Sequence, residues 1–260
     1  MKITISNSEK FSKFSNILNN MKNITDIMVI YLNEEGLYTQ GLDNANVCLY
    51  ECKIQKDWFD SYEYDEEDNF NLGINTQLLN KILSIYEYNQ TFELVIENNQ
   101  DEIDEIKINY LNTDLNDKTF NKSFTLTLTY VEHQILNLPN DDCDVELVIG
   151  SKIFSELVNQ LQLFNENVQF IFDEDKIKLI ASNETGSMET ILKFDDVNEY
   201  SITEDLELIQ EYSLRYIKLM CNFNKIDDIM KLSFLQDKPM ILKYNLNDES
   251  YFKLFIAPKF

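Results

Sequence analysis

The feature that most constrains the fold of this chain is an internal repeat, in which two segments match at an offset of about 140 residues. The segment "FSKFSNILNNMKN" lies over the segment "GSKIFSELVNQLQ". In both, apolar residues recur at i, i+3, i+4 and i+7, and they are Phe14, Ile17, Leu18 and Met21 and then Phe154, Leu157, Val158 and Leu161. This spacing places one apolar stripe along a helix. The chain is therefore expected to contain two copies of one structural unit.

Each copy continues with strands and a second amphipathic helix. The alternating runs "IMVIYL" and "LYTQGL" in the first half correspond to "VQFIF" and "KIKLIA" in the second. The segment "TQLLNKILSIY" then lies over "SLRYIKLMCNF", and strand pairs follow both. These patterns predict helices over 8–22, 75–85, 151–164 and 212–224. The predicted fold class is α+β, with two duplicated domains that carry their helices on one face of curved antiparallel sheets.

A connector separates the two copies. Residues 130–144, "YVEHQILNLPNDDCD", have apolar positions but no sustained period. A solvated linker is usually polar, but this segment contains Val131, Ile135, Leu136 and Leu138. We therefore expect an ordered segment whose apolar side chains pack on a surface. The predicted organisation is a first domain over 1–128, a connecting loop over 129–143 and a second domain over 144–260.

Net charge limits the possible functions. The chain has 260 residues, with 46 acidic and 22 basic side chains and a formal charge of −24. A protein this acidic is not expected to bind nucleic acid over its whole surface. Any DNA contact is therefore either limited to a local patch or topological, with the protein encircling the DNA. No apolar run approaches the roughly 18 residues that span a bilayer, and no signal peptide is evident. Four cysteines without a C-x-x-C pair fit a reducing compartment, so we expect an intracellular, soluble protein with no membrane contact.

Three motifs in the order of the chain carry a resemblance to a known family. They are "GLYTQGLDNANVCLYECKI", "LQDKPMILKYNL" and the terminal "FIAPKF", and the connector adds "LNLP". With the duplication, they make the chain similar over nearly its full length to the sliding DNA clamps of the proliferating cell nuclear antigen (PCNA) type. The resemblance implies two processivity-fold domains and a ring of three identical chains that encircles double-stranded DNA. It further implies a processivity factor for DNA polymerase that is opened by a clamp loader, docks replication and repair proteins, and needs no cofactor.

The resemblance also implies which residues face DNA and which join the subunits. Helices should line the central hole, and the four predicted helices carry a net charge of about +5 in a chain of −24. The candidates for sequence-independent phosphate contact are Lys10, Lys13, Lys22, Lys81, Lys152, Arg215 and Lys218. Ring closure needs edge strands, which we place around Phe124 and around Met188 and Ile191. The third helix holds Glu156 and Asn159, where relatives often carry Arg, so we expect it to carry less positive charge than the same helix in the family.

Partner proteins of the family bind through a short peptide with an aliphatic and two aromatic residues. The pocket carried over from the family comprises Leu42, Asp43, Asn46, Val47, Leu136, Leu138, Pro139, Pro239, Phe255, Ile256, Ala257 and Pro258. We expect these positions to form one exposed apolar patch, with the backbone after Ala257 free to pair with a partner's main chain. Asn46 and Cys143 replace a frequent His and Tyr, which predicts a shifted peptide preference.

Two other classes of function compete with a clamp. An enzyme is not indicated, because the single histidine, His133, has no recognisable nucleophile and the acidic runs match no metal-binding loop. A clamp-like scaffold, or a checkpoint or viral transcription factor that never encircles DNA, is the alternative. Such relatives often lose the tail and the connector motif, which this chain keeps. A composition rich in Asn, Ile and Lys fits an AT-rich genome, and the expected location is the nucleus or, alternatively, a cytoplasmic viral replication factory.

Overall fold

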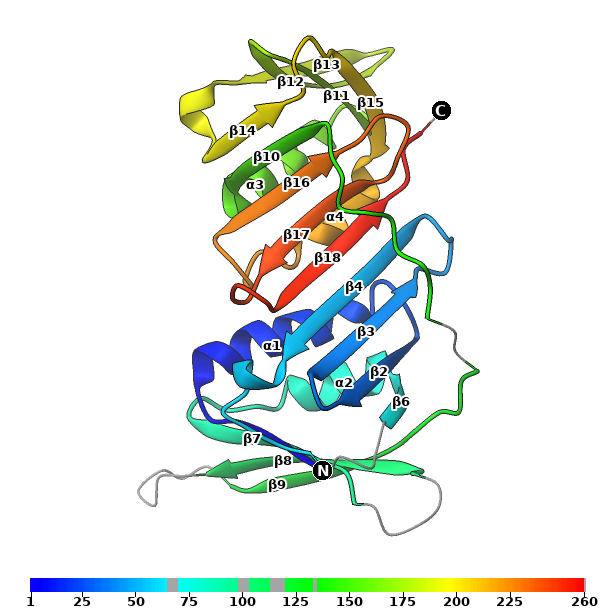
Figure 1. Ribbon diagram of the computed structural model, residues 1–260, viewed down its shortest axis with the longest axis vertical. Helices are drawn as coiled ribbons and strands as arrows, with labels where there is room; N and C mark the ends of the chain where they lie inside the picture. Colours follow the sequence, from blue (N-terminus) through cyan, green and yellow to red (C-terminus); the bar gives the residue numbers. More distant parts are fainter. Residues whose placement is uncertain (65–69, 98–102, 113–119, 133–134, 260) are drawn as a thin grey trace. The chain divides into compact units, whose positions relative to one another are not determined.

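A computed structural model describes residues 1–64, 70–97, 103–112, 120–132 and 135–259, which form two compact units (Figure 1). The N-terminal unit comprises Met1–Asn44, Glu51–Leu136 and Leu246–Phe252, and the C-terminal unit comprises Ala45–Tyr50, Asn137–Asn245 and Lys253–Phe260. Each unit thus takes a short segment from the other half of the chain, which the predicted domain ranges did not include.

The N-terminal unit contains two helices, α1 (Ser8–Met21) and α2 (Thr76–Leu83), which pack beside each other. One of its sheets has the strand order β5 (Ser61–Glu63), β1 (Lys2–Ile5), β7 (Gln90–Val95), β8 (Glu105–Asn112), β9 (Lys122–Thr127). A second run of neighbours is β6 (Phe70–Asn75), β2 (Ile27–Asn33), β3 (Gly36–Leu42), β4 (Cys48–Gln55), and a 3₁₀ turn, η1, covers Lys56–Trp58.

The C-terminal unit repeats this plan with α3 (Ser151–Leu161) and α4 (Leu214–Cys221). One run of strands has the order β14 (Glu199–Ile202), β10 (Val145–Gly150), β16 (Ile229–Phe234), β17 (Met240–Asn245), β18 (Tyr251–Ile256). The other sheet has the order β13 (Gly186–Leu192), β12 (Lys176–Asn183), β11 (Asn167–Asp173), β15 (Leu208–Ser213), and η2 covers Phe194–Asp196. In Figure 1 helices α1 and α2 lie behind β2, β3 and β4, and helices α3 and α4 lie behind β10, β16 and β17.

The apolar helix stripes predicted from the repeat form the core of each unit. Phe11, Phe14, Ile17, Leu18 and Met21 of α1 are buried, and Phe154, Leu157, Val158 and Leu161 of α3 are buried in the same way. Strands pair antiparallel in both units, as β2 does with β3 and β7 with β8 in the N-terminal unit, and β10 with β16 and β11 with β12 in the C-terminal unit. The duplicated α+β fold is therefore confirmed. The helices end one to three residues earlier than the periodicity predicted, because their last turns leave the regular pattern.

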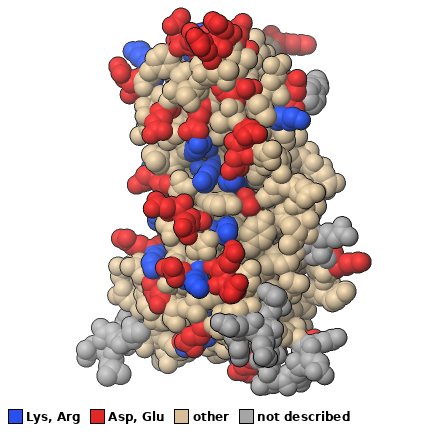
Figure 2. Space-filling view, viewed as in Figure 1, with Lys and Arg blue, Asp and Glu red and all other residues tan. Residues whose placement is uncertain are grey.

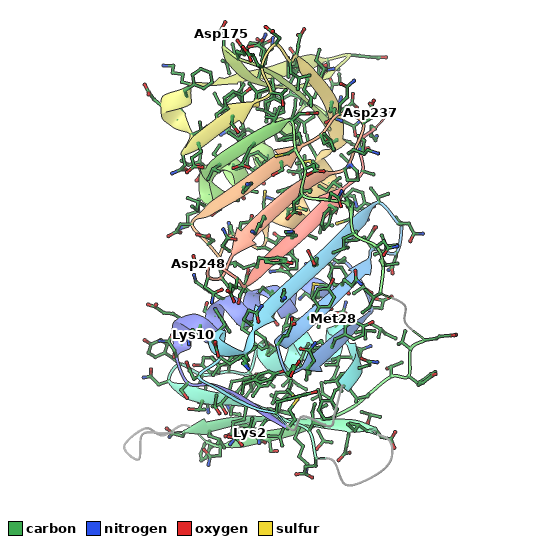
Figure 3. All side chains as sticks on the ribbon, viewed as in Figure 1. Lys2, Lys10, Met28, Asp175, Asp237 and Asp248 are labelled. Atoms are coloured by element: carbon green, nitrogen blue, oxygen red, sulfur yellow. The ribbon has the colours of Figure 1, made fainter. Side chains whose placement is uncertain are left out.

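Acidic side chains are spread over both units. Figure 2 shows them prominently on the face where the strands lie in front of the helices, with Lys and Arg side chains between them. One group gathers at the top of the view, where Asp175 lies in the turn between β11 and β12 (Figures 2 and 3). Among the described residues, no helix is long and apolar enough to cross a membrane.

Candidate functional site

The second half of the connector forms one wall of a pocket in the C-terminal unit. Leu138, Pro139, Asn140 and Asp142 lie opposite the turn between β16 and β17 and enclose a cavity of about 330 Å³. The opposite wall is made by Ser233, Leu235, Lys238, Pro239 and Ile241. Three of the predicted pocket residues, Leu138, Pro139 and Pro239, are thus brought together from positions about 100 residues apart in the sequence.

Hydrogen bonds from β15 hold the turn that forms this opposite wall. The Gln210 amide donates to the Leu235 carbonyl at 3.2 Å, and the Tyr212 hydroxyl lies 2.9 Å from Gln210 Oε1 and 3.4 Å from the Lys238 carbonyl. Burial raises the pKa of Tyr212, so its hydroxyl stays protonated as a donor. Asp237, in this turn (Figure 3), has a φ of 58°. A buried frame therefore fixes the shape of one pocket wall.

An ion pair fixes the other wall. Lys253 of β18 has only 8% of its side chain exposed, and its ammonium donates to both carboxylate oxygens of Asp141, at 2.8 and 2.7 Å. Asp144 accepts a hydrogen bond from the Gln236 N–H at 3.2 Å, which ties the end of the connector to the turn. Sequence reasoning missed this anchor, because a lysine inside an apolar strand run reads as an exposed residue.

The C-terminal tail is more buried than predicted. Phe255 is 3% exposed and Ile256 is fully buried, so these two side chains belong to the core and not to an exposed patch. All five residues Phe252–Ile256 are buried, so this strand is covered on both faces, since successive side chains of a strand point to opposite faces. Ala257 and Lys259 are exposed and Pro258 is half-buried.

The backbone of the tail is not free, which corrects a second expectation. The Ala257 N–H donates to the Val47 carbonyl at 3.2 Å, and the Lys259 N–H donates to the Glu211 carbonyl at 2.8 Å. Pro258 has no N–H. The tail is therefore held against the 45–50 segment and against β15, and these two donors are already engaged.

The remaining pocket residues are divided between the two units. Val47 is half-buried and Asn46 is exposed, with a φ of 55°, and both belong to the C-terminal unit. Leu42 is 38% exposed, whereas Asp43 and Leu136 are half-buried, and these three belong to the N-terminal unit. Whether the two groups form one site stays a prediction.

The first half of the connector is attached to the N-terminal unit. The Thr129 N–H donates to the Gly73 carbonyl of β6 at 2.8 Å. A Cβ added at Gly73 would lie 2.1 Å from the Thr129 oxygen, so only glycine permits this approach. Ile135 is 65% exposed and Val131 is 37% exposed, so these two apolar side chains touch the N-terminal unit but are less covered than the sequence had suggested. His133 lies outside the described residues.

All seven basic residues predicted to face DNA lie on or next to the four helices, but their partners differ. Lys10 pairs with Asp60 at 2.7 Å, and Lys152 lies 3.5 Å from Asp228. Lys22 donates to Asn80 of α2 at 2.8 Å, and Lys218 of α4 donates to Asn159 of α3. An amide partner, unlike a carboxylate, leaves the lysine charge uncompensated. The other three are half-buried or exposed, and they are Lys13, Lys81 and Arg215.

The strands predicted to join subunits are edge strands. Phe124 lies on β9, which ends one sheet of the N-terminal unit, and Met188 and Ile191 lie on β13, which ends a sheet of the C-terminal unit. Because side chains alternate along a strand, Met188 and Ile191 point to opposite faces of β13. Ile191 is 56% exposed and Met188 is half-buried. Their placement at edges is confirmed, and their contact with another subunit stays a prediction.

Nothing in the described part of the chain resembles a metal centre. No group of three or more His, Cys, Asp and Glu side chains there is arranged to hold an ion. Cys48, Cys52 and Cys221 are buried and form no disulfide, and burial raises the pKa of Cys221 to about 11, which makes it unreactive near neutral pH.

Comparison with known proteins matches the chain in two halves. Residues 7–134 match the N-terminal domain of proliferating cell nuclear antigen, and residues 137–259 match its C-terminal domain. The chain is 27% identical over 258 residues to "Proliferating cell nuclear antigen 1" of Plasmodium falciparum, covering 92% of this chain and 90% of that one. It is 25% identical over 248 residues to "DNA polymerase sliding clamp 1" of Sulfolobus acidocaldarius, covering 94% of each. The protein of the same name from Thermococcus kodakarensis is 24% identical over 248 residues, covering 95% of this chain and 94% of that one.

Proposed function

The chain belongs to the proliferating cell nuclear antigen family of sliding clamps, and we propose that three copies close into a ring around double-stranded DNA. In this function the ring contacts phosphates without reading sequence, tethers a DNA polymerase as its processivity factor and is opened by a clamp loader. It also docks other replication and repair proteins. The proposal includes no catalytic step and no cofactor.

Placement of charge is the observation that carries the proposal. Helices α1, α2, α3 and α4 carry net charges of +1, +1, 0 and +2, whereas the whole chain carries −24. Positive charge is therefore concentrated on elements that in a ring of this family face the hole. Mobile phosphate contacts of this kind let a ring slide, because no contact depends on a base.

The edges of the two units support closure by strand pairing. An edge strand presents unpaired N–H and C=O groups that a neighbouring chain can complete. Strands β9 and β13 lie at sheet ends in different units, so pairing β9 of one copy with β13 of the next uses two different surfaces. Contacts between unlike surfaces generate rings when the rotation closes.

We propose that the pocket between the connector and the β16–β17 turn receives part of the partner peptide. Its apolar wall residues, Leu138, Pro139, Pro239 and Ile241, suit an aliphatic or aromatic side chain. Burying each such side chain contributes roughly 1.5–3 kcal/mol before the ordering of the peptide is subtracted. Binding in the micromolar range is expected, which permits exchange between partners.

Two measurements test encirclement. Light scattering over a range of concentrations is expected to give about three times the chain mass of 30.7 kDa. After loading by a clamp loader, the protein is expected to stay on nicked circular DNA and to leave when that DNA is linearised. Equal retention on circular and linear DNA, or a mass of one chain at all concentrations, contradicts the ring.

A matched pair of leucine variants tests the pocket. Leu138→Ala is expected to weaken binding of a peptide with the partner motif by about tenfold, because roughly 1.4 kcal/mol of apolar contact is lost. Leu163→Ala removes a leucine that is 79% exposed after α3 and serves as the control. Unchanged affinity in Leu138→Ala, with both variants folded, removes this pocket from the binding site.

One observation favours the alternative function, an acidic scaffold that never encircles DNA. Helix α3 is neutral, since Lys152 is offset by Glu156 and Asn159 is uncharged. The circular DNA measurement separates the two functions, because a scaffold that binds partners outside a ring is lost equally from circular and linearised templates.

A further inference from the structure

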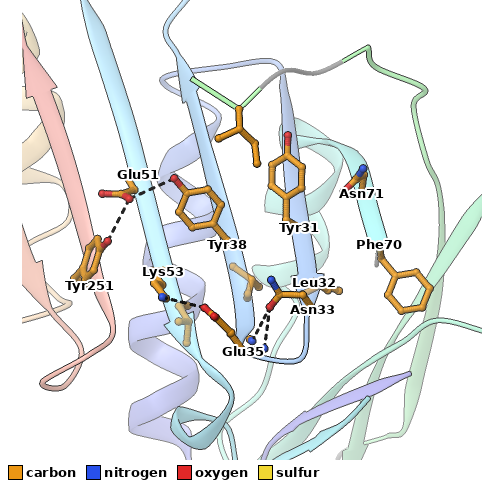
Figure 4. Close-up of a pocket in the computed structure, with 14 residues that line it drawn as sticks. Tyr31, Leu32, Asn33, Glu35, Tyr38, Glu51, Lys53, Phe70, Asn71 and Tyr251 are labelled. Atoms are coloured by element: carbon orange, nitrogen blue, oxygen red, sulfur yellow. Dashed lines mark hydrogen bonds and ion pairs between the residues drawn. The ribbon is translucent and has the colours of Figure 1, made fainter. Parts of the chain in front are cut away.

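A second and larger pocket lies in the N-terminal unit, apart from the site described above. It has a volume of about 590 Å³ and opens on strands β2, β3, β4 and β6 (Figure 4). Its described lining residues come from these four strands, from β18 and from the β2–β3 turn, and Ile135 of the connector joins them. Neither the family resemblance nor the charge pattern of the helices accounts for this pocket.

Aromatic side chains form one wall. Tyr31 and Tyr38 are directly opposite each other in the β2–β3 pairing, so they lie on the same face of the sheet. Their ring centroids are 6.2 Å apart with an angle of 43° between the planes. Figure 4 shows both hydroxyl groups pointing the same way along the sheet, with Tyr251 on the far side of Glu51. The pocket thus offers several π faces to a ligand.

A buried carboxylate lies among these rings. Glu51 is only 6% exposed, and its Oε1 accepts hydrogen bonds from the hydroxyls of Tyr38 at 3.3 Å and Tyr251 at 3.2 Å. Desolvation, together with the nearby Glu51 charge, raises the pKa of Tyr38, which keeps this hydroxyl a donor at all physiological pH values. The rings and the carboxylate are therefore held as one hydrogen-bonded group.

The remaining charges leave the lining net negative. Lys53 pairs with Glu35 at 3.2 Å, and Glu35 is placed by the β2–β3 turn, where Asn33 Oδ1 accepts from the N–H groups of Glu35 and Gly36. With two carboxylates and one ammonium, the charged lining residues sum to −1. An anionic ligand is disfavoured here, and so is a purely apolar one that would cover charged groups without pairing them.

We propose that this pocket binds a lysine or arginine side chain of a partner polypeptide. A cation over tyrosine faces gains from the ring quadrupole, and a carboxylate beside the rings adds a charge partner. The volume exceeds that of one side chain, and Ile135 at the rim offers apolar contact to a neighbouring residue of the partner. This inference goes beyond the proposed clamp function, because it does not need a ring, DNA or the C-terminal pocket.

Blocked pentapeptides with a central arginine, lysine, citrulline or glutamate test the proposal on the full chain. Citrulline keeps the shape of arginine without its charge. NMR signals of the Ile135 methyl groups and of the Tyr31 ring are expected to shift with the arginine and lysine peptides. The citrulline peptide is expected to bind at least tenfold more weakly, and the glutamate peptide is not expected to bind.

Variants locate the site. Tyr31→Leu is expected to weaken the arginine peptide about twofold to thirtyfold, the range of a cation–π contact. Leu138→Ala, in the other unit, is expected to leave it unchanged, so failure of this inference and failure of the proposed peptide pocket are distinguishable. Equal binding of arginine and citrulline peptides overturns the proposal, as does the absence of any shift at Ile135. Shifts that appear when the protein alone is concentrated point to a second copy in the pocket and also overturn it.

Discussion

The ion pair between Lys253 and Asp141 predicts how firmly the connector is held. Asp141→Asn removes the charge of the carboxylate but keeps one acceptor for Lys253, whose side chain is only 8% exposed. A hydrogen bond between charged groups contributes roughly 1.5–3 kcal/mol. Asp141 is 66% exposed, so water screens much of this attraction. We therefore expect the free energy of local opening of the connector to fall by about 1 kcal/mol in Asp141→Asn.

Hydrogen exchange measures this loss where it occurs. About 1 kcal/mol corresponds to roughly fivefold faster exchange of the connector amides over 138–144 through local opening. Lys253→Met is expected to have a smaller effect, because an apolar side chain of similar length needs no charge partner when it is buried. Asp142→Asn makes the same chemical change one residue away and is the control. Equal exchange in Asp141→Asn and Asp142→Asn refutes the anchoring role of the pair.

Three further predictions follow from other contacts. Burial tends to raise the pKa of Asp60, but hydrogen bonds from Lys10 and from the N–H groups of Ser6 and Asn7 outweigh it and hold that pKa below 3.8. Asp60→Asn should therefore destabilise the protein above about pH 4 and lose this effect as the pH falls through the folded pKa, in urea titrations at several pH values. Gly36→Ala should cost about 2 kcal/mol or more in urea unfolding, since its Cβ would lie 2.2 Å from the Ile54 oxygen at a φ of 141°, whereas Gly186→Ala meets only ordinary contacts. Arg215→Gln should weaken duplex binding at low salt without changing the melting temperature.

The helices and strands could be predicted because local patterns specify them. The stripe of Phe14, Ile17, Leu18 and Met21 predicts a helix with one buried face, and α1 is that helix. The repeat then predicted the second unit without further information. Apolar residues that recur every two residues lie on one face of a strand, and those that recur about every 3.6 residues lie on one face of a helix. Such patterns therefore indicate both the element and its buried face.

The site was predicted less well because it depends on contacts distant in sequence. In the sequence, the spacing of Phe252, Leu254 and Ile256 is that of a strand with one covered face, which would expose the residues between them, yet Lys253 and Phe255 are buried as well. Which faces of a strand are covered depends on segments that are distant in the sequence, so the strand's own residues do not determine it. The pocket around Tyr31 and Tyr38 was missed for the same reason, because it needs the register of β2 on β3.

If the helices face DNA as proposed, the partners of the basic residues determine which of these residues can contact phosphates. Lys10 faces a carboxylate, whereas Lys22 and Lys218 bridge their two helices through amides, one bridge in each unit. Only the second arrangement stiffens a helix pair and still presents a full positive charge. Replacing Lys218 by Gln should therefore lower the slope of log affinity for a short duplex against log salt concentration by about one phosphate contact, and Lys10→Gln should change it much less. If both variants lower the slope equally, pairing with a carboxylate does not prevent a lysine on these helices from contacting phosphate. The charge argument for the ring then loses its physical basis.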